Sequence, residues 1–368
     1  MSRVEYSAKD CAHMARALRL AARGRYTAHP NPMVGCVLVR DDNVVGEGWH
    51  VSTGDAHAEI NALQAAGDQA RGSSAYITLE PCVHYGKTPP CSDALIKAGV
   101  RNVIVALQDP FEGGGGRGLK QLDDAGINTS VGLMAAAAAE LNAGFLQRVT
   151  QHRPFVRMKL ASSLDGAIAM ASGESQWITG PDARADVQHL RARSGAVMTG
   201  IGTVLADDPS LNVRASDIDT GGLQPLRVIL DSQMRMPLAA GMLTLPGWTL
   251  VCCAGDHDAT ALQKAGAEVM SFAGSSGRVD ARAVLAELAT RGVNDVLVEA
   301  GPVLAGHLLE EDLVDELVIY QAPHIMGSQT MGMVNTPSWS SLADRKVLEI
   351  KDIRRIGTDM KITAVRPD

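Results

Sequence analysis

Four residues in the first half of the chain combine side chains that bind zinc and move protons. His57 is followed two positions later by Glu59, and two cysteines, Cys82 and Cys91, come after the next apolar run. One imidazole and two thiolates give three ligands, and a zinc ion held by three protein ligands keeps its fourth tetrahedral position open to water. Zinc lowers the pKa of such a water to about 7, which makes hydroxide available at neutral pH. The pattern predicts a catalytic site with one Zn2+ per chain.

Glu59 lies close enough to this site to move protons without binding the metal. Zinc-dependent nucleobase deaminases share the order H-x-E, then P-C and a second Cys, and use the glutamate as general acid and base. A lone His-x-Glu arises often by chance, and a buried cysteine is usually a small hydrophobic residue. The three elements in this order favour the catalytic interpretation. The remaining cysteines are interpreted as structural: Cys11, Cys36, Cys252 and Cys253.

The spacing between the two cysteines differs from that of deaminases that act on nucleic acids or cytidine. Nucleic-acid and cytidine deaminases typically keep two residues between them, whereas residues 83–90 intervene here. This insert contains His84 and Lys87, two polar groups that could hold a ligand.

The second half has glycines at strand-to-helix turns instead of a dinucleotide-binding signature. No G-x-G-x-x-G follows a strand, so a Rossmann site is not supported. Gly200, Gly202 and Gly301 follow apolar runs, and glycine there lets a phosphate approach the backbone amides at a helix start. Many such turns carry glycine only to reverse the chain.

The elements that must position these residues alternate between apolar runs and helical patterns, which is typical of α/β architecture. The break at His152-Arg153-Pro154 places a domain boundary near residue 150. Helices are expected at 57–66, 91–99 and 135–147. Strands are expected at 33–39, with a turn at 41–43 into a second short run, and at 75–79, 102–107, 155–161, 195–200, 226–231, 249–253, 295–301 and 316–323.

Composition excludes several classes of protein. The 368 residues include 34 Lys and Arg against 41 Asp and Glu, a net charge of -7 that argues against a nucleic-acid partner. Six cysteines in a chain of this length do not make a disulfide framework. The chain begins without an export signal, and its longest run of small apolar residues, 133–139, is too short to span a membrane. We expect a cytoplasmic protein without a membrane partner; a homo-oligomer is compatible with the sequence.

The chain resembles the bifunctional riboflavin-biosynthesis deaminase/reductase family along essentially its whole length. In the first half the resemblance rests on Asn31-Pro32-Met33-Val34-Gly35, the His57 and Cys82 motifs, the Gly-Lys-Thr-Pro-Pro insert before Cys91, and Gln108-Asp109-Pro110. In the second half it rests on residues 159–166, 175–180, 202–209 and 211–214.

This resemblance implies the fold, the activity and the site residues. Residues 1–150 would form a cytidine-deaminase-like, three-layer α/β/α domain with a mixed sheet, and residues 151–368 an α/β reductase domain similar to dihydrofolate reductase. His57, Cys82 and Cys91 would hold zinc, and Glu59 would be catalytic. The deaminase substrate contacts would be Asn31, His84, Lys87 and Asp109. NADPH would be bound by Ala161, Trp177, Thr203, Asp207, Ser232 and the segment Gly301, Pro302, Val303, Leu304, Ala305, Gly306 and His307. The reductase substrate would meet Lys159, Ser175, Arg191, Leu211, Arg214 and Glu299.

The family's reaction sequence implies a small pyrimidine ribose-phosphate as partner. Zinc hydroxide would deaminate 2,5-diamino-6-(5-phosphoribosylamino)pyrimidin-4-one, and NADPH would then reduce the ribosyl group to ribityl. Arg191 and Arg214 suit the phosphate, because guanidinium groups bind phosphate in a bidentate manner.

The chain departs from the family pattern after Pro110. Phe111 stands where the family usually has asparagine, and the run Gly113–Gly116 follows. Two other classes of function stay open at this point. One is a nucleic-acid or free-nucleoside deaminase, and the other is a zinc-stabilised binding protein without turnover, for which His84 could supply a fourth ligand.

Overall fold

The chain divides into two compact units, Met1–His152 and Arg153–Asp368, each described here by itself. The structure is a computed structural model that describes residues 5–83, 89–111, 115–274, 277–337 and 339–367. The predicted substrate contacts His84 and Lys87 lie outside these described residues.

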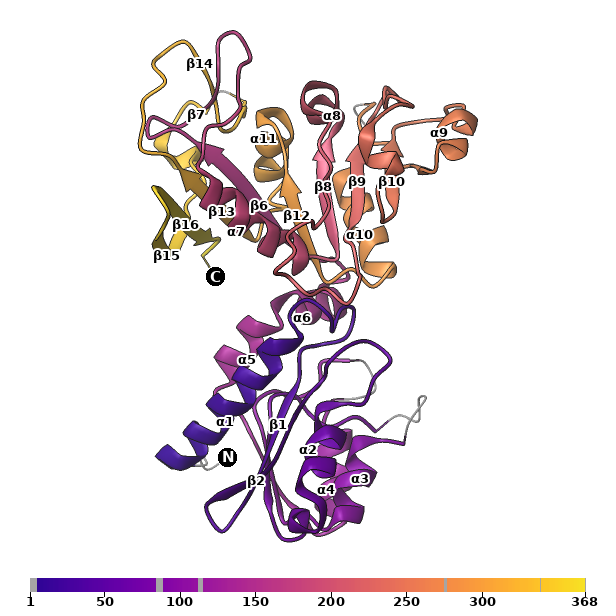
Figure 1. The fold of residues 1–368 in the computed structure, drawn as a ribbon, viewed down its shortest axis with the longest axis vertical. Coiled ribbons are helices and arrows are strands. Elements are labelled where there is room, and N and C mark those ends of the chain that lie inside the picture. Colours follow the sequence, from indigo (N-terminus) through magenta and orange to yellow (C-terminus); the bar gives the residue numbers. More distant parts are fainter. Residues whose placement is uncertain (1–4, 84–88, 112–114, 275–276, 338, 368) are drawn as a thin grey trace. The chain divides into compact units, whose positions relative to one another are not determined.

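The first unit is built on a five-stranded mixed sheet in the order β2-β1-β3-β4-β5 (Figure 1). The central strand pairs β3–β4 and β4–β5 are parallel, whereas β1 runs antiparallel to both of its neighbours. The strands are β1 (Gly35–Arg40), β2 (Asn43–Trp49), β3 (Ser74–Ile77), β4 (Asn102–Val105) and β5 (Asn128–Val131).

Helices cover both faces of this sheet, because alternate strand residues point to opposite sides. Cys36 and Leu38 of β1 pack in one cluster with residues of α2 (Ala58–Ala66), α3 (Cys91–Ala98) and α4 (Arg117–Asp124). Val37 and Val39 pack in another with residues of α1 (Ala8–Ala21) and α5 (Ala135–Leu141). Figure 1 shows these two helical layers on either side of the strands. The three-layer arrangement with a mixed sheet is confirmed.

The single helix predicted over 135–147 is wrong. Helix α5 ends at Leu141, and α6 (Ala143–Gln151) begins after Asn142. The buried Asn142 carboxamide accepts a hydrogen bond from Met33 N at 2.8 Å and donates one to Met33 O at 2.9 Å. The backbone of Asn142 leaves helical geometry, with φ -110° and ψ 23°, at the position where its side chain binds the distant Met33 backbone. Apolar periodicity carries no sign of that contact.

The second unit contains a nine-stranded sheet in the order β11-β10-β9-β8-β12-β6-β13-β16-β15. All neighbouring pairs among the first seven strands of this order, from β11 at one edge to β13, are parallel. Strand β16 runs antiparallel to both of its neighbours, β13 and β15. The strands are β6 (Phe155–Ser162), β8 (Ala196–Gly200), β9 (Leu226–Leu230), β10 (Thr249–Cys253), β11 (Glu268–Ser271), β12 (Asp295–Glu299), β13 (Glu316–Gln321), β15 (Glu349–Ile356) and β16 (Asp359–Val365). A separate ribbon pairs β7 (Ala167–Met170) with β14 (Thr330–Gly332).

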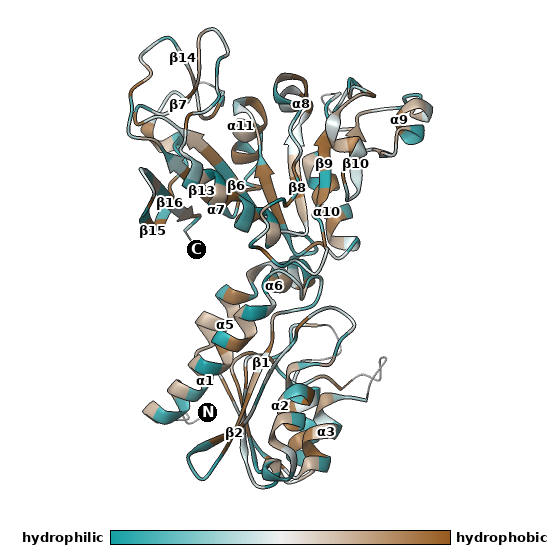
Figure 2. Cartoon of the chain, viewed as in Figure 1, coloured by the Kyte–Doolittle hydropathy of each residue, from teal (hydrophilic) through white to brown (hydrophobic). Residues whose placement is uncertain are grey.

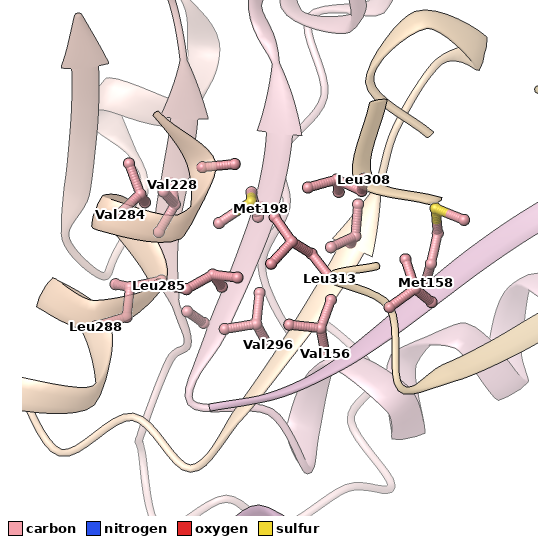
Figure 3. Packing of buried hydrophobic residues seen from close by; sticks show 14 of the residues in the cluster. Val156, Met158, Met198, Val228, Val284, Leu285, Leu288, Val296, Leu308 and Leu313 are labelled. Atoms are coloured by element: carbon pink, nitrogen blue, oxygen red, sulfur yellow. The ribbon is translucent and has the colours of Figure 1, made fainter. Parts of the chain in front are cut away.

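Two apolar clusters hold helices against the faces of this sheet. Strand residues such as Val156, Met198 and Val296 point toward Leu285 of α10 (Ala281–Thr290) and Leu308 of α11 (Pro302–Glu310), as Figure 3 shows. The opposite face packs against α7 (Pro181–Ala192), α8 (Ile201–Asp207) and α9 (Thr260–Lys264). In Figure 2 the central strands β6 and β12 are largely hydrophobic, whereas the edge strand β15 is largely hydrophilic and helices such as α1 mix both kinds of residue. No helix among the described residues is long and apolar enough to cross a membrane.

Candidate functional site

The three predicted zinc ligands converge in the first unit although they come from three segments. His57 directly precedes α2, Cys82 lies in the loop after β3, and Cys91 is the first residue of α3. Their ligand atoms lie within 4.8 Å of one another, with His57 Nδ1 at 3.6 Å from Cys82 Sγ and 3.3 Å from Cys91 Sγ. Tetrahedral zinc with Zn–N of about 2.0 Å and Zn–S of about 2.3 Å places N and S about 3.5 Å apart. The three residues therefore fit zinc.

Close packing of α2 on β2 places His57 and Glu59. A Cβ atom at Gly48 would lie 2.3 Å from Ala58 O, and one at Gly46 would lie 2.3 Å from Ala62 O. Only glycine permits these approaches, so the first turn of α2 rests directly on the strand. Glu59 is buried as a result, with 3% of its surface exposed.

The electrostatics of the site suit a cation. Burial raises the pKa of Glu59 to about 7, and the hydrogen bond with Cys82 raises the pKa of His57. The hydrogen bond between the thiols lowers the pKa of Cys82 to about 4 and raises that of Cys91. A positive ion nearby favours the ionised forms of Glu59 and the two cysteines and the neutral form of His57, which is the form that binds a metal. Zinc would thus stabilise two thiolates and an ionised Glu59.

Sequence reasoning missed His50, which lies against the ligand His57. The two rings meet edge-on with their centroids 5.6 Å apart, and His50 is 3% exposed. His50 Nδ1 lies 3.3 Å from Ala56 O, and Nε2 lies 3.0 Å from Nδ2 of the predicted substrate contact Asn31. One tautomer satisfies both contacts, with Nδ1–H donating to Ala56 O and Nε2 accepting from Asn31. A single histidine after a strand belongs to no sequence pattern that could have predicted its contacts with His57 and Asn31.

Asp109 lies on the segment that follows β4. Its backbone N–H donates to Glu80 Oε2 at 3.1 Å, and its carboxylate accepts from Phe111 N–H at 3.0 Å. Phe111 itself is 53% exposed. The ring that replaces the family's asparagine is therefore not part of the core.

In the second unit, several predicted residues meet at the carboxyl edge of the parallel strands. Lys159 and Ala161 lie on β6, Glu299 ends β12, and Gly301 precedes α11. Ligands of open α/β sheets bind at this edge, and helix N-termini there favour anions. The α11 N-terminus has no side-chain cap.

Two orphaned polar atoms support a ligand at the same edge. Among the described residues, Ser162 Oγ at the end of β6 and Thr199 Oγ1 near the end of β8 are buried without a hydrogen-bond partner. Arg157 Nη1 and Asp231 Oδ1 are the other buried atoms of this kind in the described part of the chain, and an unpaired buried polar group calls for a water, an ion or a bound group as partner. These hydroxyls and the uncapped start of α11 are the features of this edge that suit a phosphate-bearing ligand.

The residues predicted to bind NADPH differ in their solvent exposure. Trp177 is 68% exposed, with the Arg184 guanidinium 4.5 Å from its ring centroid. Asp207 is exposed, and its Oδ1 lies 3.4 Å from Gln176 Nε2. Thr203 is half-buried in α8, whereas the Ser232 hydroxyl accepts a hydrogen bond from Val279 N–H at 3.1 Å.

The segment from Gly301 to His307 is only partly accessible. Val303 is exposed, while Gly301, Pro302, Leu304 and His307 are half-buried. Ala305 is fully buried in the core, and Gly306 packs against Asn335 O. The first turn of α11 is therefore the part that can meet a cofactor through its side chains.

Arg191, one of the two predicted phosphate contacts, is paired with Glu299 in the structure. Its Nε and Nη2 donate to Glu299 at 2.6 and 3.0 Å, and its Nη1 donates to Asn212 O at 3.1 Å. The side of the buried guanidinium formed by Nε and Nη2 thus faces a carboxylate, and a phosphate would meet the remaining Nη1 and Nη2 hydrogens. Arg214 is the exposed guanidinium of the two predicted phosphate contacts.

The other predicted substrate contacts lie in different environments. Leu211 is 1% exposed within an apolar cluster, so its side chain packs in the core. Ser175 is half-buried. Burial lowers the pKa of Lys159, which pairs in register with Glu299 on the neighbouring strand.

Two known protein families match this chain, one in each of its two units. Residues 7–107 match the family described as the cytidine and deoxycytidylate deaminase zinc-binding region. Residues 154–362 match the RibD C-terminal domain.

Full-length relatives match nearly the whole chain. Riboflavin biosynthesis protein RibD of Escherichia coli is 47% identical over 361 residues, which cover 96% of this chain and 98% of that protein. The protein of the same name from Haemophilus influenzae is 47% identical, with 98% of each chain covered.

Solved structures agree with this likeness. Acinetobacter baumannii RibD superposes with a TM-score of 0.91 at 43% identity, covering 98% of this chain and 99% of that one. A diaminohydroxyphosphoribosylaminopyrimidine deaminase/5-amino-6-(5-phosphoribosylamino)uracil reductase from Thermotoga maritima gives a TM-score of 0.84 at 29% identity, with 98% and 99% covered. The expected fold, with a cytidine-deaminase-like first domain and a dihydrofolate-reductase-like second domain, is confirmed.

Proposed function

Because this chain belongs to the RibD family and is a bifunctional deaminase and reductase of riboflavin biosynthesis, we propose a division of labour between its two units. Residues 1–150 carry the deaminase, and residues 151–368 carry the reductase. The observation that carries this proposal is the convergence of His57, Cys82 and Cys91 beside the buried carboxyl group of Glu59.

The deaminase acts on 2,5-diamino-6-(5-phosphoribosylamino)pyrimidin-4-one. When bound by His57, Cys82 and Cys91, zinc supplies Lewis acidity at its fourth position, where the pKa of water falls to about 7. Glu59 takes a proton from the attacking water and returns it to the amino group, which leaves the ring carbon as ammonia. Asn31 and Asp109 hold the substrate, together with His84 and Lys87, which lie outside the described residues.

His50 positions Asn31 in this scheme. Its Nε2 accepts from the Asn31 carboxamide, which fixes which way that amide faces. The His50 ring is itself held by Ala56 O and by its contact with the His57 ring. The position of the Asn31 amide relative to the zinc ligand His57 is therefore fixed.

The reductase binds NADPH at the carboxyl edge of β6, β8 and β12. The cofactor supplies a hydride for ribose C1, and the ring opens to a ribityl chain, so the protein contributes mainly orientation. Trp177, Thr203, Asp207 and the first turn of α11 line the cofactor site. Arg214 meets the substrate phosphate, while the Arg191–Glu299 pair shapes the pocket beside Lys159.

One assay tests the proposal on the purified full-length protein. The aminopyrimidine substrate should release one ammonia per molecule, and NADPH should then be oxidised in the same stoichiometry. Cytidine, offered as a control, should release none. Metal analysis should find one zinc per chain. A zinc-loaded protein that releases no ammonia from the aminopyrimidine would contradict the proposal.

A further inference from the structure

Glu80 is a buried carboxylate in the first unit that the deamination chemistry does not use. It stands two residues before the zinc ligand Cys82 and is 5% exposed. Its own backbone N–H donates to Leu107 O at 2.8 Å, which fixes the segment after β3 to the segment after β4.

Four backbone N–H groups donate to the Glu80 carboxylate, two to each oxygen. Oε2 accepts from Asp109 N at 3.1 Å and from Gly116 N at 2.9 Å. Oε1 accepts from Gly118 N at 2.8 Å and from Leu119 N at 3.2 Å. An ionised carboxylate offers acceptors only, so this set of four donors matches it fully. Hydrogen bonds to a charged acceptor are also stronger than neutral ones.

These donors lie at both ends of the connection between β4 and α4. Asp109 is at its beginning, and Gly116 to Leu119 form its end and the first turn of α4. No side chain caps α4 from its own sequence, and Gly116 precedes it with a φ of 79°. A residue 38 positions earlier in the chain supplies the anion that this helix start favours.

The same contacts bring α4 against the zinc-ligand segment. A Cβ atom at Gly118 would lie 2.3 Å from Pro81 O, the carbonyl of the residue before Cys82. Further along α4, Gln121 accepts from the Ser92 hydroxyl at 2.8 Å, and Ser92 N donates to Cys82 O at 3.3 Å. Glu80 thus joins three parts of the chain: the segment of residues 80–82, the start of α4, and the backbone from Asp109 to Phe111, which is called the Asp109 turn below.

We infer that Glu80 is a positioning residue for deamination, which holds the Asp109 turn and the α4 start in register with the zinc ligands. This inference rests on the proposed deaminase function, in which Asp109 contacts the substrate. Glu80 touches neither zinc nor substrate and acts through the backbone it binds. Loss of its carboxylate should therefore weaken substrate binding more than it slows the chemical step.

The test compares the full-length Glu80→Gln variant with wild type and a control. Glutamine keeps the size but puts an amide donor among four N–H donors, so at least one pair of bonds is lost. Glu47→Gln is the control, because it removes a partly exposed carboxylate of the same unit that pairs with Arg16. Gly118→Ala is a second variant that keeps Glu80 and forces α4 away from Pro81 O.

For both Glu80→Gln and Gly118→Ala we expect the KM for deamination to rise about tenfold or more, because small misplacements of binding groups are costly. The kcat should fall about threefold at most, the zinc content should stay at one per chain, and NADPH oxidation with the deaminated intermediate should be normal. Glu47→Gln should behave as wild type.

A normal KM in folded, zinc-loaded Glu80→Gln would overturn the inference. If that variant fails to fold, a normal KM in Gly118→Ala would overturn it equally. The wild-type assay separates the two claims, since absence of ammonia release there contradicts the proposed function and not the role of Glu80.

Discussion

Different local contacts place the zinc ligands. The packing of α2 on Gly46 and Gly48 places His57. Cys82 and Cys91 are held together at the start of α3, where Ser92 N donates to Cys82 O at 3.3 Å and Cys91 N lies 3.4 Å from Cys82 Sγ. The order and chemistry of these residues predicted the metal site, because zinc ligands are few in type and recur at characteristic spacings. His50 and Glu80 could not be predicted, because their roles depend on backbone groups that only folding brings near.

Loss of either zinc thiol should abolish metal binding. We expect Cys82→Ser and Cys91→Ser to retain less than about a tenth of the zinc after dialysis, because a hydroxyl is a poor ligand for zinc compared with a thiolate. Metal analysis of the purified variants measures this. Cys11→Ser is the matched control, since Cys11 is exposed on α1 and should keep full zinc. Full zinc in both site variants would show that the ligands are others.

Glu299→Gln should impair reduction and leave deamination intact. Removal of one partner of a buried ion pair leaves Arg191 uncompensated, which costs about 3–5 kcal/mol of stability in such sites. We expect NADPH oxidation with the deaminated intermediate to fall at least tenfold while ammonia release stays normal. Glu268→Gln is the control, because its pair with Arg291 is more exposed than the Arg191–Glu299 pair. NADPH oxidation at the wild-type rate in both variants would show that Glu299 does not contribute to the reductase site.

At the level of helices and strands, burial decided what the sequence could predict. The strands expected from apolar runs are present, although most of them end one or two residues earlier. Strand β15 was not predicted, because it is an edge strand whose residues are mostly exposed, and a strand without a buried face has no apolar run. Strands β5, β7, β11 and β14 have only three or four residues, and in β16 only Asp359 and Ala364 are buried, so none of them has a long run of buried apolar residues.

Helix α7 is joined to strands β13 and β16 by a pH-sensitive contact. Asp186 accepts hydrogen bonds from the Tyr320 hydroxyl and from Lys361 Nζ, the latter at 2.6 Å. Burial raises the pKa of Asp186, but these partners outweigh burial and hold the pKa below its usual 3.8. A carboxylate with a lowered pKa in the folded state adds stability above its unfolded pKa, and that stability is lost as the pH falls through the folded pKa.

Asp186→Asn should therefore destabilise the protein most near neutral pH. We expect a cost of about 1–3 kcal/mol at pH 7, which diminishes as the pH falls below about 4. Thermal unfolding of wild type and variant across this range measures the difference. Asp124→Asn, which loses only the exposed pair with Lys120, should show little change at any pH. A difference that grows on acidification would contradict the assignment.

At the scale of the whole molecule, the proposed function places two separately working sites in one chain. The zinc ligands and Glu59 lie in the unit Met1–His152, and the residues assigned to NADPH lie in Arg153–Asp368. Their order along the chain made two activities predictable, whereas the Arg191–Glu299 pairing and the break at Asn142 required the structure. A single carboxylate in one unit should consequently affect one activity alone.

Glu59→Gln, assayed for both reactions on one preparation, tests this claim most directly. Glutamine keeps the size and hydrogen bonding of Glu59 but cannot accept the proton, and positioned acid-base groups contribute about 10²–10⁴-fold. We expect ammonia release to fall by at least that upper figure, because Glu59 acts twice in each turnover. Zinc content and NADPH oxidation with the deaminated intermediate should remain normal. Near-normal ammonia release would contradict the role of Glu59, and loss of both activities in a folded protein would contradict the division between the units.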